Sequence, residues 1–477
     1  MNHQELSGRV DSLLGQVGLN QKSGGGKLSF TGLDPVLPTV LKSGAASACV
    51  LAANAIASAA IWQARGGEGQ DVHVDLRLAP HVQSPFMAPN LQYTRIHDVP
   101  VGLNQNFWGS TTGNVTLRCK DGGWVHHCAV YPSQVLKSNR LLNTGCHPDQ
   151  LAAAALQWNA QDLEDAAAEI RLPISRVRTV EEWKASEQYQ AIRDLPLILL
   201  EKIGDSPPIP LPPAARPLSG LRALGMVHVV AGPTVLRQLG AQGADSLNLC
   251  LPDYAERPDI WLNSDTGMRS AFLNCKTPEG RQRVYDLVSQ ADVFVHNLAP
   301  GTVEKEGFSA EELASRRPGL IYASVSCYGT AGPWKDRVGF DLNGAAVAGL
   351  LTCEGTPEQP RFPMLNVVND FLTGYLVAIG VQAALLRRAR EGGSYRVRVG
   401  LTPTTTFLLD FGLIAREQWA NLDPARALQT PRLVTAETPM GRFTRMASQV
   451  DLSKTPEYWE DPIIAPMGAS AAEWRAL

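Results

Sequence analysis

The sequence predicts an α/β protein in which a Rossmann-like parallel sheet carries helices on both faces, accompanied by a smaller α+β domain. From about residue 216 onward, short apolar strands alternate with helical segments, which is the pattern of a parallel sheet covered by helices. A proline-rich segment at 205–217 marks a boundary before this region. Upstream of it, two strands flank a turn at 121–123, and a helical stretch at 150–192 follows, which indicates a separate α+β unit.

The totals are those of a globular protein with substantial cores. The chain has 477 residues, 44% of them hydrophobic and 19% charged, with a net charge of -3. Without a basic stripe, neither nucleic acid nor an anionic membrane is an expected partner. No basic-then-apolar leader and no run of 18 apolar residues occurs, so neither a signal peptide nor a spanning helix is expected. Eight scattered cysteines without a CxxC pair indicate reduced thiols and a cytoplasmic location.

The first residues read as a flexible N-terminal segment, 1–37. Its glycine-rich stretch 22–27 (KSGGGK) lacks the GxxxxGK[ST] spacing of a phosphate-binding loop and is interpreted as a mobile linker. An alanine-rich helix follows at 44–65, ended by two glycines, and the alternating residues 72–76 predict a strand.

This helix and strand have a second copy later in the chain. Residues 64–76 match residues 389–401 with a constant offset of 325. The segment 38–109 is therefore interpreted as a partial first copy of a helix–strand unit and its linker. With the same offset, Asp370 corresponds to Ala45, so only the second copy has a carboxylate where its helix begins.

The α+β unit is assigned to 110–204, and its hairpin raises the question of a metal site. Cys119, His126, His127 and Cys128 are all of ligand type. Neighbouring strand residues point to opposite faces, so the two histidines do not readily share one ion. No metal site is predicted.

The second half has five expected strands, at 221–230, 246–251, 268–273, 292–297 and 320–325. Thr277 followed by Pro278 is a strong helix start. The turn after the first strand is not GxGxxG, so NAD binding is not expected. Ligands of open α/β sheets lie at the carboxyl ends of the strands, where His228 and Asn297 are expected.

Asp370 stands at the start of a long apolar helix that runs to about residue 386. Aspartate is a preferred helix cap, because its carboxylate accepts hydrogen bonds from the free backbone N–H groups and is favoured by the helix dipole. A carboxylate in this position also suits a covalent nucleophile. Both roles are compatible with the pattern, and the cap is the commoner one.

Several motifs occur together in a fixed order. They are 217–224 (PLSGLRAL), 228–233 (HVVAGP), 276–281 (KTPEGR), 291–301 (ADVFVHNLAPG), 320–326 (LIYASVS), 339–342 (GFDL) and 370–374 (DFLTG). This series resembles the family III CoA-transferases, which include formyl-CoA and carnitine CoA-transferases and the related α-methylacyl-CoA racemases. The resemblance is specific over 216–401, and the end of the chain and residues 38–200 resemble the family more loosely.

The resemblance implies the family III fold, with a Rossmann-like CoA-binding and catalytic domain at 216–423 and a C-terminal return segment at 424–477. The small-domain-like part precedes the catalytic part, an order that indicates a fused, rearranged tandem. An interlocked homodimer is implied, and we expect residues 110–200 to cover the active site of the same or the partner chain. CoA and acyl-CoA are implied as substrates, with no permanently bound cofactor.

The resemblance makes Asp370 the nucleophile of a CoA transfer from an acyl-CoA donor to a carboxylic acid, through aspartyl anhydride and aspartyl-CoA intermediates. Backbone donors at the helix start would stabilise the oxyanions. The racemases carry a histidine where this chain has Phe340, so two-base isomerisation is disfavoured. Asp341 either supports the nucleophile from behind or is a turn residue.

The family's CoA contacts carry over to a set of seven positions: His228, Ala231, Arg269, Leu273, Asn297, Leu298 and Lys305. The chain departs from the family at 247–251 (LNLCL), where the usual acidic and basic residues after the second strand are missing. This departure weakens the expected grip on the nucleotide. It keeps open a second interpretation, a non-catalytic or regulatory homologue that binds acyl-CoA.

Overall fold

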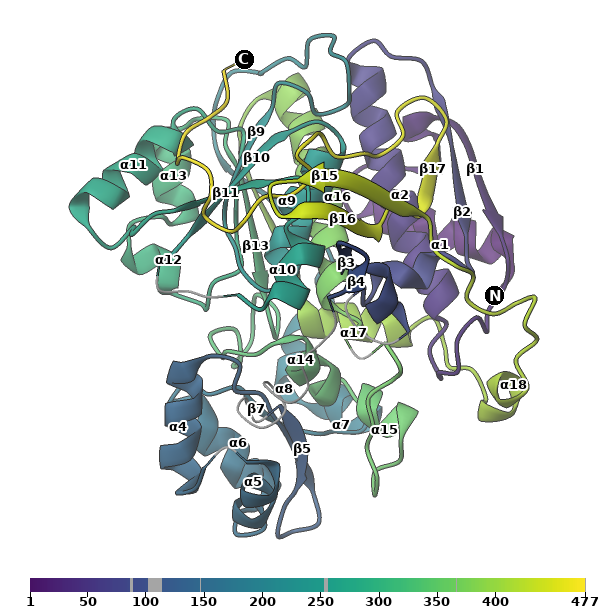
Figure 1. Cartoon of the computed structure of the whole chain (residues 1–477), viewed down its shortest axis with the longest axis vertical. Helices are drawn as coiled ribbons and strands as arrows, with labels where there is room; N and C mark the ends of the chain where they lie inside the picture. The colour runs from purple at the N-terminus through teal and green to yellow at the C-terminus, as the bar shows by residue number, and fades with distance from the viewer. Residues whose placement is uncertain (86–88, 102–113, 146, 253–255, 366, 477) are drawn as a thin grey trace.

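The computed structural model describes residues 1–85, 89–101, 114–145, 147–252, 256–365 and 367–476. Its centre is a seven-stranded sheet (Figure 1). In spatial order the strands are β11 (Arg269–Phe272), β10 (Asp245–Cys250), β9 (Arg222–Met226), β12 (Val293–His296), β13 (Ile321–Ser326), β14 (Ser394–Gly400) and β8 (Leu199–Gly204). All neighbours are parallel except β14 and β8. The predicted parallel sheet is confirmed.

Helices cover both faces of this sheet, because successive strand residues point to opposite sides. In β12, Val293 and Val295 belong to the core shared with α2 (Ser43–Ala64), α9 (Ala231–Ala241) and α16 (Asp370–Glu391). Phe294 belongs to the core on the other face, with α11 (Pro278–Val288) and α13 (Ala310–Arg316). Short α10 (Pro258–Ser264) and α12 (Thr302–Lys305) lie in the connections.

The first strand of this sheet is shorter than predicted. β9 ends at Met226, whereas the sequence pattern continued to residue 230. Val229 has a φ of 61°, a conformation that β-branched residues rarely adopt, so the chain turns there before α9 begins. The residues from Val227 to Val230 therefore form an irregular loop at the carboxyl edge of the sheet.

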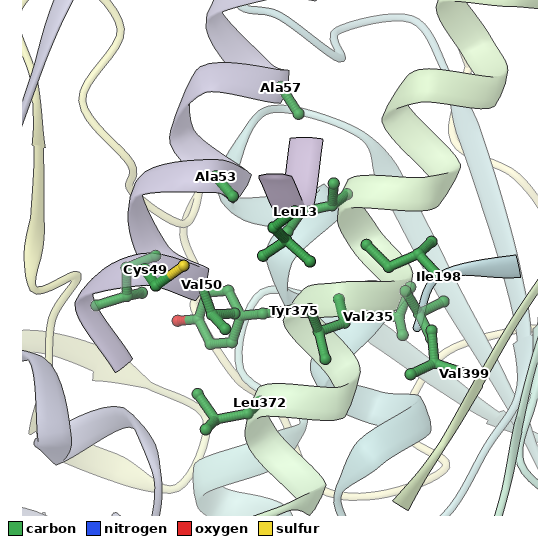
Figure 2. Close-up of a cluster of buried hydrophobic side chains, with 14 of the residues drawn as sticks. Leu13, Cys49, Val50, Ala53, Ala57, Ile198, Val235, Leu372, Tyr375 and Val399 are labelled. Carbon is green, nitrogen blue, oxygen red and sulfur yellow. The ribbon is translucent and has the colours of Figure 1, made fainter. Parts of the chain in front are cut away.

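Helices α2 and α16 pack against each other in the main core (Figure 2). Val50 of α2 and Leu372 and Tyr375 of α16 lie in one cluster with Leu13 of α1 (His3–Gly15) and Val235 of α9. Both long helices have the length and mean hydropathy of a membrane span, 1.7 and 1.2, although neither is an unbroken run of 18 apolar residues. The structure buries 100% and 94% of these windows inside the protein.

The first copy of the repeat has its own small sheet, in the order β1 (Gly25–Thr31), β2 (Gln70–Asp75) and β17 (Val450–Leu452). β1 is parallel and β17 antiparallel to β2, as β13 and β8 are to β14. The register agrees, because Thr31 pairs with Asp75, Ser326 pairs with Gly400, and the offset of 325 relates Asp75 to Gly400. The two units therefore have the same arrangement.

The expectation of a flexible segment at 1–37 is wrong. α1 buries Leu6, Val10 and Leu13 in the main core, and the glycine-rich stretch forms a 3-10 turn, η1 (Gln21–Gly24), and the start of β1. A Cβ on Gly26 would lie 2.1 Å from the carbonyl oxygen of Gln70. Close approach of two backbones, and not mobility, explains the glycines.

The α+β unit is confirmed as a small domain with a core of its own. The predicted hairpin is β5 (Val115–Arg118) and β6 (Trp124–His127), to which β7 (Ile174–Arg176) adds a third strand. Helices α4 (Pro132–Leu142), α5 (Pro148–Ala155) and α6 (Ala160–Glu169) cover it. Helices α7 (Val180–Ala185) and α8 (Glu187–Ile192) then lead to β8 of the large sheet, so the expected domain end at 204 comes too late.

The hairpin histidines lie apart. His126 contacts the ring of Phe362 edge-on with centroids 4.9 Å apart, whereas His127 Nε2 lies 2.6 Å from Ser138 Oγ. Within the described ranges, no group of three or more His, Cys, Asp or Glu side chains could hold a metal ion.

The remaining elements connect the halves. α14 (Asp341–Val347), α15 (Leu350–Glu354), α17 (Leu401–Leu409) and α18 (Arg416–Ala420) lie around the second copy, and η2 (Ala79–Val82) and η3 (Asn90–Tyr93) follow the first. The C-terminal segment forms β15 (Leu433–Thr438) and β16 (Gly441–Met446), which pair with β3 (Arg95–Ile96) and β4 (Val99–Pro100) in one sheet. The segment thus returns to the first half of the chain.

Candidate active site

A cavity of about 370 Å³ lies at the carboxyl edge of the large sheet. Its wall includes residues that follow β9, β10, β12 and β13, together with the loop 337–340 and Asp370 at the start of α16. Five small-domain residues complete the wall: Tyr131, Ser133, Gln134, Lys137 and Arg171. The small domain therefore covers this cavity within the same chain. This is one of the two arrangements that the sequence left open, the other being a cover from a partner chain.

Asp370 is the first residue of α16 and is 8% exposed. Its backbone N–H donates to Asp341 Oδ2 at 2.7 Å, and the N–H of Asn369 donates to the same oxygen at 2.6 Å. The side chain that caps the helix is therefore that of Asp341, at the start of α14. In the described part of the chain, the Asp370 carboxylate accepts no hydrogen bond, so its position in the cavity wall is not explained by capping.

The two carboxyl groups influence each other. Burial raises the pKa of Asp341 to about 7, although hydrogen bonds from backbone N–H groups oppose the shift. The pKa of Asp370 is raised well above its ordinary value, first by burial and then by the negative charge of Asp341. An ionised Asp370 is thus poorly solvated, which is the condition of a reactive carboxylate.

The helix start was expected to supply backbone donors for the oxyanions. Two of its N–H groups, those of Asn369 and Asp370, donate to Asp341 and are therefore not available to a reacting group. Stabilisation of an oxyanion by other N–H groups of this turn stays a prediction.

Tyr131, His228 and Glu256 connect the two domains across the cavity. Tyr131 Oη lies 2.6 Å from His228 Nδ1 and donates to Glu256 Oε1 at 3.2 Å. Burial lowers the pKa of His228 to about 4 and raises that of Glu256 to about 7. Asn297 holds the loop from below, accepting from the His228 N–H at 3.0 Å and donating to its carbonyl at 2.7 Å. Because its pKa is lowered, the His228 imidazole is neutral at physiological pH.

Residues 218–436 match the family model described as CoA-transferase family III. The chain is also 31% identical over 268 residues to a Mycobacterium tuberculosis protein named "Probable fatty acyl-CoA transferase", a match that covers 52% of this chain and 68% of that protein. The chain belongs to CoA-transferase family III. A crystal structure of the same M. tuberculosis protein aligns with 33% identity and a TM-score of 0.39, covering 41% of this chain and 57% of that one.

Other relatives match over shorter parts. An acetyl-coenzyme A transferase of Hypoxylon pulicicidum is 32% identical over 226 residues, 46% of this chain and 38% of that protein. The beta subunit of a succinyl-CoA–L-malate CoA-transferase of Chloroflexus aurantiacus is 35% identical over 193 residues, 38% of this chain and 48% of the subunit. This family III chain thus spans 38% to 68% of the length of these three curated relatives.

Four of the seven CoA-contact residues carried over from the family lie on the cavity wall: His228, Ala231, Asn297 and Leu298. Arg269 does not. It begins β11 at the amino edge of the sheet, where it pairs with Asp245 at 2.9 Å and donates to the carbonyl of Glu473. A parallel strand presents its first residue away from the carboxyl edge, so Arg269 is separated from the cavity by the length of the strand. Leu273 and Lys305 are also absent from the wall.

The wall contains basic residues that the sequence reasoning missed: Lys137, Arg171, Lys276 and Arg337. Lys137 donates to the carbonyl of Ile170 at 2.7 Å, and Arg171 donates to the carbonyl of Pro300 across the domain boundary at 2.9 Å. Arg337 pairs with Asp165 at 3.2 Å. No sequence pattern links these residues, because they come from four separate segments.

Residues at the end of β10, where the sequence 247–251 departs from the family pattern, also lie in this wall. Cys250 and Leu251 line the cavity together with Glu256 and Asp265. Burial raises the pKa of Asp265 to about 7, and the charge of Glu256 adds to this shift. Among the described residues, the wall at this strand end is therefore acidic or neutral.

Phe340, the position that the resemblance aligned with a racemase histidine, lies in the cavity wall. Its ring lies 6.2 Å from that of Tyr131, and its backbone N–H donates to Asn343 Oδ1 at 3.0 Å. The phenyl ring offers no proton-transferring group at this place.

Proposed function

We propose that this chain transfers CoA from an acyl-CoA to a carboxylic acid, with Asp370 as the covalent carrier. The observation that supports this most strongly is that Asp370 faces the large cavity while Asp341 performs the capping of its helix. A buried carboxylate with a raised pKa is costly, so a function outside the helix accounts for its presence.

The proposed reaction has four steps. The Asp370 carboxylate attacks the thioester carbonyl of the donor, the CoA thiolate leaves, and an acyl-aspartyl anhydride forms. The thiolate attacks the aspartyl carbonyl, which releases the donor acid and leaves an aspartyl-CoA thioester. The acceptor carboxylate attacks this thioester and displaces the thiolate to give a second anhydride. Attack of the thiolate on the acceptor's acyl carbonyl forms the new acyl-CoA and regenerates Asp370.

Both intermediates hydrolyse if water reaches them, so the site must be closed during the reaction. Asp370 is 8% exposed, and Tyr131 of the small domain contacts His228 and Glu256 across the cavity. This contact supports a role of the small domain as a cover over the intermediates. The homodimer and the cytoplasmic location remain predictions from the sequence.

For the phosphates of CoA we propose Lys276, Lys137 and Arg171 in place of Arg269 and Lys305. All three line the cavity, and none of them has a carboxylate partner in the described ranges. Arg171 and Lys137 come from the small domain and Lys276 from the start of the α11 segment, so phosphate groups between them would be held by both domains. They would replace the basic residue missing after β10.

The carrier role is tested by incubating the protein with acyl-CoAs and measuring the mass of the peptide that contains Asp370. A CoA adduct on that peptide, absent in Asp370→Asn, supports the proposal. Tight binding of acyl-CoA without adduct or transfer, across several acyl groups, would favour the non-catalytic binder.

The phosphate contacts are tested by comparing an acyl-CoA with the corresponding acyl-pantetheine. In Lys276→Gln we expect KM for the acyl-CoA to rise about tenfold, with no change for acyl-pantetheine, which lacks the nucleotide phosphates. Lys305→Gln is the matched control, because Lys305 lies off the wall, and should leave both values unchanged. An equal change for both substrates would assign Lys276 a different role.

A further inference from the structure

A second, much smaller cavity of about 20 Å³ lies where three parts of the chain meet. Residues 81, 82 and 85 of the first half contribute to its wall, as do α9, α16 and the segment 445–459 of the C-terminal return. It is lined by two arginines, Arg237 of α9 and Arg445 of β16.

Both arginines are buried, each being 3% exposed. Arg237 Nη1 donates to the carbonyl of Asn263 at 2.7 Å, and its guanidinium lies 5.1 Å from the centre of the Phe371 ring. Arg445 Nε donates to the carbonyl of Met446 at 3.0 Å, and its guanidinium lies 4.6 Å from the Trp459 ring. These contacts leave Arg237 Nε and Arg445 Nη1 buried with no hydrogen-bond partner among the described residues.

Neither guanidinium has an ion-pair partner within 4 Å in the described part of the chain. Burial, followed by the positive charge of Arg237, lowers the pKa of Arg445 well below its ordinary value. Two buried arginines of like charge are costly unless enough opposite charge lies beside them.

The acidic groups that face this pair are already engaged. Glu457 lines the cavity and its charge acts on Arg237, but it forms no ion pair with either arginine within 4 Å. Its carboxylate accepts from Ser448 at 2.7 Å and Gln242 at 3.3 Å, and burial raises its pKa. Asp265 also acts on Arg237, but it accepts from Ser264 at 2.7 Å, and burial raises its pKa to about 7.

The two other titratable groups of the wall carry no negative charge near neutral pH. Burial raises the pKa of Tyr375 to about 12 and lowers that of His81, so both are neutral. Positive charge therefore remains in excess around the cavity.

We propose that this cavity binds one small monovalent anion of halide size between Arg237 and Arg445. The unpartnered N–H groups of the two side chains would donate to it, and its charge would offset theirs. The volume is that of about one water molecule, which excludes phosphate, carboxylates and any part of CoA. Through these two arginines the anion would connect α9 with β16 of the C-terminal return.

The site is tested first on the unchanged protein, by diffraction from crystals in sodium bromide. We expect an anomalous peak between Arg237 and Arg445. A water molecule there, without anomalous signal in 0.5 M bromide, would overturn the proposal.

Thermal melting supplies an independent test. At constant ionic strength, replacing gluconate with chloride or bromide should raise the melting temperature saturably, by at least ~3 °C. Arg445→Met should remove this dependence, and Arg445→Lys should retain it at higher halide concentration. Arg390→Met, at an exposed position, should behave as the unchanged protein. A melting temperature independent of the halide would contradict the site, and neither readout depends on CoA transfer.

Discussion

The two long helices of the repeat, α2 and α16, are capped in the same way but differ in the residue at the first turn. At the start of α2, the Asp34 carboxylate accepts from the N–H of Gly44 at 3.0 Å and of Ala45 at 2.8 Å. At the start of α16, the Asp341 carboxylate accepts from the N–H groups of the two residues that correspond to them with the offset of 325. Each helix is therefore capped by an aspartate from an earlier segment.

The difference lies in the side chain at the first-turn position. Ala45 is 1% exposed and packs in the core, whereas Asp370 faces the large cavity. Burial raises the pKa of both capping residues, Asp34 to about 6 and Asp341 to about 7, but only Asp341 has a second carboxyl group beside it. The comparison shows that such a helix is capped without a carboxylate of its own at this position. The Asp370 carboxylate is therefore not required for capping α16.

The largest effect is expected from removing this extra carboxylate. Asp370→Asn should lower CoA transfer at least ~10³-fold, because the nucleophile is lost. Steady-state transfer assays check this, with Asp370→Ala to exclude deamidation. Turnover within tenfold of the unchanged protein would contradict the role.

The same variant should gain stability at alkaline pH. The folded-state pKa of Asp370 is raised, so its favourable contribution is present below about pH 4 and is lost as pH rises through the folded pKa. Asparagine has no such loss. The melting temperature of Asp370→Asn relative to the unchanged protein should therefore be higher at pH 8 than at pH 5.

The converse exchange should damage the fold. Ala45→Asp places a carboxylate where there is no cavity, and we expect unfolding to become easier by about 3 kcal/mol or more. Denaturant titration measures this, with Ala45→Ser as a smaller polar control. A variant as stable as the unchanged protein would mean that the two helix starts are more alike than their burial indicates.

Removing the caps separates their structural role from their effect on the reaction. Asp34→Asn and Asp341→Asn should each destabilise the protein by about 2 kcal/mol, because an amide accepts the two N–H groups less well than a carboxylate. Only Asp341→Asn should alter the pH–rate profile. Activity should rise with pH as Asp370 ionises, and loss of the Asp341 charge should move this rise to lower pH. An equal profile shift in Asp34→Asn would contradict the assignment.

The smallest effect is expected at the junction of the two helices. Gln382 Nε2 donates to Asn54 Oδ1 at 2.9 Å, and Ser58 Oγ donates to Gln382 Oε1 at 2.5 Å. Gln382→Leu should cost about 1 kcal/mol through the unpaired partners and leave kcat unchanged. Denaturant titration and transfer assays measure the two, and a large change in kcat would show that the junction affects the site.

Local patterns were sufficient for much of the architecture. The offset of 325 identified both helix–strand units, and Thr277 caps α11 by accepting from the Gly280 N–H as its sequence predicts. The glycines at 24–26 led to a wrong prediction of a mobile linker, because a short turn packed against another strand has the same composition. β8 was also placed with the wrong domain, since the sheet a strand joins depends on partners far away in the chain.

The candidate site was only partly accessible to the sequence. Asp370 and His228 follow from motifs, whereas Tyr131 and Glu256 are brought to His228 from 97 and 28 residues away along the chain. Arg269 lies off the cavity wall, because a motif gives a residue's order in the chain but not the edge of the sheet on which its side chain lies.

By itself, the sequence determined the alternating α/β pattern, the repeated helix–strand unit and the presence of a carboxylate at one helix start and not at the other. Periodicity and capping preferences act over a few residues, so they are visible without a structure. Only the tertiary structure decided that Asp341, 29 residues away, caps the helix and leaves Asp370 to the cavity. That outcome depends on the path of the chain, because hydrogen bonds and burial between distant segments exist only once they are packed together.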